Sequence, residues 1–155
     1  MRYALDGNQR MRTISDDLEQ WLTSFISEEG AVAGTVHLRN EENLQLKAAV
    51  CIPPPVKAQI ASIPRGKGMA GLAWERDKPV STCNLATDTS GDVRPGAKAV
   101  EAQAAVALPV HDDVGTVRGV VGIAFAKERQ LSDADLSRLQ ARAESLPSHA
   151  RSLPN

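Results

Sequence analysis

The segment over residues 64–80 constrains the fold of this chain more than any other part of it. It reads PRGKGMAGLAWERDKPV: closely spaced glycines, a short apolar stretch, a charged turn and then a proline. Glycine allows tight turns and close approach of backbones, so the segment predicts a short helix over 66–74 that packs closely on its surroundings. A strand is predicted to follow over 79–83, led by the proline.

A second pattern covers residues 104–125. Its first part, AAVALPV, is continuously apolar, and its last part, TVRGVVGIAF, is rich in β-branched and apolar residues. Between them lies HDDVG, which has the polar and glycine composition of a turn. The two apolar runs therefore predict an antiparallel hairpin.

Length and composition indicate one globular domain in a reducing compartment. The 155 residues are 42% hydrophobic and 24% charged, and the net charge is -1 with the basic residues scattered. We therefore expect no nucleic-acid and no membrane partner. Two cysteines are too few for a disulfide framework, and no apolar targeting or membrane-length segment is visible, so we expect a cytoplasmic protein.

Helices are predicted at both ends of the domain. Apolar residues recur at helical spacing from Met11 to Ile26, with Thr13 as a candidate cap and Gly30 just beyond the end. Near the other end, Ser132 and the aspartate three residues later form a candidate capping box before a second apolar stripe that runs to residue 146. Residues 1–12 are expected to be flexible and residues 148–155 disordered, leaving a single domain over 13–147.

Between these helices, strands are predicted from alternating apolar residues over 31–38 and 44–50, with each run presenting one apolar face. Three prolines at 53–55 end the second strand and precede a short predicted helix over 56–63. Residues 84–98 read as a long loop, a kind of segment that is often functional. The fold class is therefore α+β: a central antiparallel sheet of about five to six strands, with the terminal helices on one face and the short helices and long loop on the other.

The order of these patterns resembles the GAF domain family, and more broadly a GAF- or PAS-like architecture. The family pattern Gly-x-Gly-apolar-small-Gly followed by Lys-Pro-Val is similar to residues 66–71 and 78–80 here. The late family pattern, a strand ending in Pro-Val and a Gly-apolar-apolar-Gly strand, is similar to 108–110 and 119–122. In place of the aspartate that the family often has after the third strand, this chain has Cys83 and Asn84; asparagine keeps the capacity for hydrogen bonds but supplies no carboxylate.

The resemblance implies a ligand pocket between the sheet and the long loop. Aromatic residues make up only 3% of the chain, which disfavours purine and tetrapyrrole ligands that stack on rings. We expect an unknown compact metabolite in a mostly aliphatic pocket, with a few polar groups from the loop. The candidate ligand-binding residues are Met69, Trp74, Val80, Cys83, Asn84, Asp88, Asp92, Arg94, Val106 and Leu108.

The sequence contains no motif typical of a phosphate-binding, metal or catalytic site. The glycine segment lacks the Gly-Lys-Ser/Thr ending of a phosphate loop. His37, His111 and His149 share no metal-ligand spacing, so no metal site is expected. No catalytic residue and no cofactor are identified.

The expected function is that of a small-molecule-binding sensory or regulatory domain. No output domain follows in the sequence, so we expect it to act through an unknown signalling partner or through a homodimer formed by the terminal helices. Two alternatives remain open. One is a GAF-type free methionine-R-sulfoxide reductase that uses Cys83, since some proteins of this fold are such enzymes. The other is an interaction module whose pocket is filled by its own side chains.

Overall fold

The computed structural model describes residues 14–82 and 103–147. The expected flexible N-terminus, the loop at 84–98 and the C-terminal tail lie outside these residues. The described elements follow one another as α1 (Ile14–Glu29), β1 (Ala33–Asn40), β2 (Asn43–Val50), α2 (Pro54–Gln59), β3 (Ser62–Pro64), α3 (Gly68–Arg76), β4 (Val80–Thr82), β5 (Ala104–His111), β6 (Val117–Phe125) and α5 (Asp133–Ala143).

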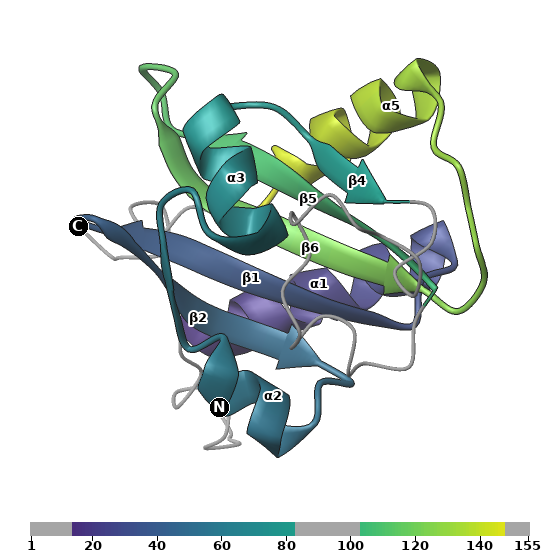
Figure 1. Cartoon of the computed structure of the whole chain (residues 1–155), viewed down its shortest axis with the longest axis horizontal. Helices are drawn as coiled ribbons and strands as arrows, with labels where there is room; N and C mark the ends of the chain where they lie inside the picture. The colour runs from purple at the N-terminus through teal and green to yellow at the C-terminus, as the bar shows by residue number, and fades with distance from the viewer. Residues whose placement is uncertain (1–13, 83–102, 148–155) are drawn as a thin grey trace, which may run out of the picture.

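The six strands form one sheet in the order β3-β2-β1-β6-β5-β4, and all neighbours that pair do so antiparallel. Figure 1 views the sheet from the side on which α2 and α3 lie, with α1 behind it. This arrangement confirms the predicted α+β class. It also confirms the predicted hairpin, which consists of β5, β6 and the turn between them.

Helices α1 and α5 share one face of the sheet, as their single apolar stripes predicted. Leu18, Leu22 and Phe25 of α1 are almost fully buried against the core, as is Leu139 of α5. Helix α1 ends before Gly30, whose φ of 72° suits the left-handed conformation that commonly follows a helix. The predicted capping box of α5 is present, because the Ser132 side chain accepts a hydrogen bond from the Asp135 amide.

The prediction that one face of 44–50 is apolar is wrong because strand β2 contains a bulge. Along β1 and β2 the paired residues change from Val36–Ala48 to His37–Leu46, which leaves Lys47 without a partner of its own. An extra residue reverses the face on which the following side chains lie. Leu44 is therefore buried on the α3 side of the sheet, and Ala48 on the α1 side.

The predicted helix over 56–63 is also wrong in its second half. Helix α2 begins with two prolines and ends at Gln59, and residues 62–64 form strand β3. Strand β3 pairs with the first residues of β2 and buries Ile63, which is 5% exposed. Pairing with a strand distant in sequence and burial of this side chain outweigh the local helical pattern.

Candidate functional site

A cavity of about 140 Å³ lies on the face of the sheet opposite α1 and α5. Three strands contribute its floor, and α2, β3 and the start of α3 contribute its walls. An apolar cavity of about 150 Å³ accommodates a molecule the size of benzene, so this space suits a compact ligand. The lining residues are Ala33, Gly34, Thr35, His37, Ile52, Val56, Ile60, Ile63, Lys67, Gly68, Met69, Ala70, Ala105, Val106, Ala107, Gly122, Ile123 and Ala124.

The cavity exists because small residues occupy paired positions of the central strands. Ala105 of β5 pairs with Ala124 of β6, and Ala107 pairs with Gly122. Thr35 of β1 pairs with Gly122 from the other side, and its hydroxyl would lie 3.1 Å from a side chain added there. Larger side chains at these positions would fill the space between the sheet and α3.

His37 is the most deeply buried polar side chain at the cavity. It lies on β1 and is 2% exposed, and its Nε2 lies 2.8 Å from the carbonyl oxygen of Ile60. A carbonyl only accepts hydrogen bonds, so Nε2 carries the proton and donates it. Burial lowers the pKa of His37, although the bond to Ile60 opposes this effect, and the ring is therefore neutral near pH 7.

The neutral ring leaves Nδ1 of His37 as a lone-pair acceptor. This atom is buried and has no hydrogen-bond partner among the described residues. An unpaired buried acceptor costs free energy of about 1 to 3 kcal/mol. A group that donates a hydrogen bond to Nδ1 would remove that cost.

The start of α3 adds a positive edge to the cavity. Gly66 and Gly68 adopt φ angles of 82° and 65°, and the Gly66 amide donates to the Gly71 carbonyl at 2.9 Å, which folds the glycine segment onto the helix. Among the described residues, the amides of Gly68, Met69 and Ala70 donate no backbone hydrogen bond, as expected for a helix N-terminus. The first turn carries no acidic residue, and Lys67 precedes it.

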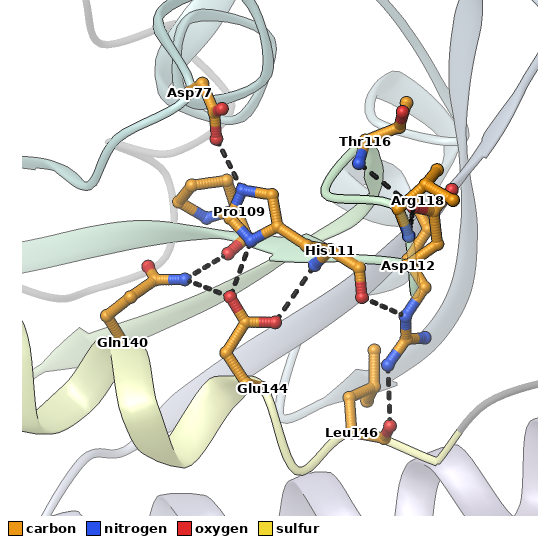
Figure 2. A network of polar contacts seen from close by, with 10 residues as sticks. Asp77, Pro109, His111, Asp112, Thr116, Arg118, Gln140, Glu144 and Leu146 are labelled. Carbon is orange, nitrogen blue, oxygen red and sulfur yellow. Dashed lines mark hydrogen bonds and ion pairs between the residues drawn. The ribbon is translucent and has the colours of Figure 1, made fainter.

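The other end of α3 is tied to the C-terminal helix through His111. Figure 2 shows the imidazole between two carboxylates. Nε2 lies 2.5 Å from Oδ1 of Asp77, the residue that follows α3, and Nδ1 lies 2.6 Å from Oε2 of Glu144, the residue that follows α5. We call Asp77, His111 and Glu144 the carboxylate–histidine clasp.

Both ring nitrogens of His111 face acceptors, so the clasp fits the imidazolium form. Partial burial lowers the pKa of His111, but the hydrogen bonds and charges of Asp77 and Glu144 outweigh it and raise the pKa above its usual value. For Glu144, burial raises the pKa, and the hydrogen bonds from His111 and Gln140 outweigh it and lower the pKa. His111 is therefore protonated and Glu144 ionised over a range of mildly acid pH.

Of the candidate residues taken from the sequence, only some lie at the cavity. Met69 lines it, and Val106 borders it although its side chain belongs to the core on the α1 side. Trp74 and Val80 are buried on the α3 side without lining the cavity. Leu108 was expected at the pocket but packs on the opposite face, in the core beneath α1 and α5. The candidates Cys83, Asn84, Asp88, Asp92 and Arg94 lie outside the described residues.

Sequence reasoning missed His37, Thr35 and the small residues of the floor. His37 and Thr35 occupy the positions of β1 that alternate with its apolar residues, and such positions usually face solvent. The sequence could have indicated their burial, because the predicted short helices had to cover the face of the sheet on which Thr35 and His37 lie.

The described residues contain no cluster of histidine, cysteine or acidic side chains suited to a metal ion. In the same part of the chain, no helix has the length and apolar character needed to cross a membrane. Cys51, at the end of β2, is an exposed free cysteine.

The antiparallel sheet, the helical layers and the glycine segment at the cavity can be compared with known families. The family model described as GAF domain matches residues 11–146. The chain belongs to the GAF domain family. No curated protein matches it at a significant level.

Solved structures share the GAF fold at low sequence identity. The GAF domain from Acinetobacter phosphoenolpyruvate-protein phosphotransferase has a TM-score of 0.69 and 19% identity, covering 93% of this chain and 87% of that one. The type II free methionine-R-sulfoxide reductase from Thermoplasma acidophilum has a TM-score of 0.66 and 16% identity, covering 86% and 92%. The second GAF domain of DevS from Mycobacterium smegmatis has a TM-score of 0.64 and 18% identity, covering 86% and 90%.

Proposed function

We propose that this GAF domain binds a compact small molecule in the cavity and serves as a sensory or regulatory module. The observation that carries the proposal is the cavity itself, which has a floor rich in alanine and glycine and a buried acceptor on His37 that no other described residue pairs with. A sheet face that only had to be covered would be filled by larger side chains. A concave, mostly apolar space with a few polar groups is typical of ligand sites.

Helix α3 supplies a route by which occupancy would be communicated. Its first residues line the cavity, and the residue after its last turn contacts His111 in the clasp. The clasp continues to Glu144 at the end of α5. A shift of α3 on binding would therefore change the position of α5, which we expect a signalling partner or a second copy of the chain to read.

A screen of compact metabolites by thermal unfolding tests the proposal. A ligand that binds the native state alone raises the melting temperature. We expect shifts with the wild-type protein and none with Ala105→Leu, which fills the floor of the cavity. The matched control is Ala58→Leu, an exposed position on α2 that does not line the cavity and should retain the shifts. Shifts that survive in Ala105→Leu would contradict binding at this site.

A thiol reductase is the second candidate, because solved reductases share this fold. In that reaction two thiols are oxidised to a disulfide while the sulfoxide is reduced to the thioether and water is released. The chain has two cysteines, Cys51 and Cys83. Turnover of free methionine-R-sulfoxide with dithiothreitol that disappears in Cys83→Ser would establish this activity, and absence of turnover would favour the binding module.

The third candidate, an interaction module without a ligand, predicts a different result in the same screen. It requires that no compact metabolite shifts the melting temperature and, because its pocket is filled by its own side chains, that Ala105→Leu lowers the melting temperature by overpacking. Native mass spectrometry of freshly purified protein adds a second measurement, since a bound adduct would contradict this candidate.

A further inference from the structure

We propose that the ligand of the cavity is a compact aliphatic carboxylate that also carries a hydrogen-bond donor. Its carboxylate would lie at the N-terminus of α3 beside Lys67, and its donor would meet Nδ1 of His37. This inference rests on the function proposed above and narrows it to one chemical class.

The charge at one side of the cavity favours an anion. The amides at the start of α3 have no backbone acceptor among the described residues, and the helix dipole adds partial positive charge there. Lys67 lines the cavity and forms no ion pair within residues 14–82 and 103–147. Within residues 14–82 and 103–147 no acidic side chain lines the cavity, so these residues offer a cationic ligand no ion pair. Backbone amides at a helix N-terminus bind carboxylates well.

His37 supplies the second and independent requirement. Its imidazole lines the cavity, its Nε2 donates its proton to the Ile60 carbonyl, and its Nδ1 is a buried acceptor that has no partner in the described part of the chain. The matching ligand group is a hydroxyl or an N–H, because only a donor satisfies a lone pair. Burial also lowers the pKa of His37, which keeps this lone pair available at neutral pH.

The floor and the volume of the cavity determine the size and polarity of the rest of the ligand. Ala105, Ala107, Gly122 and Ala124 offer apolar surface and no hydrogen-bonding side chains. The space of about 140 Å³ is below the range of about 300 to 1,000 Å³ typical of drug-sized ligands. Apart from the imidazole of His37, no aromatic side chain lines the cavity in the described residues. A short aliphatic chain fits these walls better than a nucleobase does.

Three related probes test the inference by isothermal titration calorimetry: isovalerate, isovaleramide and α-hydroxyisovalerate. The first two differ in charge, and the third adds a hydroxyl donor. We expect isovalerate to bind about tenfold more tightly than isovaleramide, since the helix N-terminus and one cation together supply stabilisation of roughly that size. We expect α-hydroxyisovalerate to bind more tightly than isovalerate.

Matched variants identify the groups responsible. Lys67→Gln should reduce the preference for isovalerate over the amide, whereas Lys57→Gln, on the exposed surface of α2, should leave it unchanged. His37→Phe should remove the advantage of the α-hydroxyl. Because a buried substitution can impair folding, the ¹⁵N resonance of Nδ1 in the wild-type protein is the second measurement, and it should shift with α-hydroxyisovalerate but not with isovalerate.

If isovalerate and isovaleramide bind with equal affinity, the proposal that the ligand is an anion is wrong. If α-hydroxyisovalerate does not change the ¹⁵N chemical shift of Nδ1, the proposed hydrogen bond to His37 is wrong. Absence of binding by all three probes would overturn the inference as a whole. The proposed function fails separately, only when the broader metabolite screen also produces no shift that depends on residue 105.

Discussion

Nε2 of His111 lies 2.5 Å from Oδ1 of Asp77, and this contact joins the end of β5 to the residue that follows α3. Asp77 has a φ of 52°, the left-handed conformation at the end of a helix. Glu144 holds the other nitrogen of the imidazole from the end of α5. The clasp therefore connects the layers on the two faces of the sheet at its edge, as Figure 2 shows.

The clasp should contribute more to the free energy of unfolding at mildly acid pH than at alkaline pH. The pKa of His111 is raised by folding, so its contribution is complete below the unfolded value of 6.5 and is lost as pH rises through the folded value. We expect the free energy of unfolding of the wild type to exceed that of His111→Gln by more at about pH 6 than at about pH 9. Urea unfolding at both values measures this difference.

Asp77→Asn and Glu144→Gln are the companion variants for the clasp. Each removes one carboxylate, so each should lower the pKa of His111 as followed by NMR. A stability difference between wild type and His111→Gln that is the same at both pH values would contradict the ionised clasp. Below the unfolded pKa of Glu144, 4.5, the contribution of that carboxylate should also fall, because folding lowers its pKa.

The sequence correctly predicted the helices and strands that bury a single apolar face, because such burial produces a regular local pattern of apolar residues. The stripes of α1 and α5 and the alternation of β1 are local consequences of such burial. Strand β3 was missed because it pairs with β2 across the intervening helix α2. The bulge at Lys47 lies in the hairpin of the consecutive strands β1 and β2, and it was missed because alternation along one strand does not show which residue lacks a partner in the other. Local patterns carry no information on the partner of a strand.

The candidate site was harder to predict for a related reason. Strand β5 is apolar on both faces because helices cover both, so its pattern did not show whether Leu108 or Ala107 faces the cavity. His37 alternates with the apolar residues of β1, and such positions commonly face solvent. It is buried because α2 and α3 cover this face of the sheet, and its Nδ1 has no partner among the described residues.

His37 should be neutral and should carry its proton on Nε2 at mildly acid pH. Its pKa is lowered by burial, so folding releases a proton and stability falls as pH decreases below 6.5 toward the folded value. This trend opposes that of His111, and we therefore expect it to be clearest in His111→Gln. Two-dimensional NMR of the imidazole nitrogens measures tautomer and titration. A ring that titrates near 6.5, or that is protonated on Nδ1, would contradict the assignment.

Glu29 should contribute more to stability than its neighbour Glu28. The side chain of Glu29 is 5% exposed at the end of α1, and it accepts hydrogen bonds from Arg138 at 2.7 Å and Arg142 at 3.2 Å, both on α5. We expect Glu29→Ala to cost about 1 to 3 kcal/mol, since it removes charge-assisted bonds between two helices. Glu28→Ala is the matched control: it also removes a contact with Arg142, but its side chain is 57% exposed, so its cost should be below about 1 kcal/mol. Equal losses on chemical denaturation would contradict this distinction.

Gly71→Ala tests whether the glycine segment needs glycine at this position so that α3 can pack closely on β3. Helix propensity alone predicts that alanine would stabilise α3 by about 1 kcal/mol. The structure predicts the opposite, because a Cβ at this position would lie 2.6 Å from the Pro64 carbonyl oxygen and 3.1 Å from the Gly66 amide nitrogen. These are backbone atoms that cannot move aside as a side chain can, so we expect a loss of about 2 to 3 kcal/mol in the free energy of unfolding. Gly115→Ala is the control, since its added Cβ meets nothing within 4 Å and only the positive φ of 87° opposes it, at about 1 kcal/mol. A more stable Gly71→Ala protein in urea unfolding would show that the segment serves something other than close packing of α3 on β3.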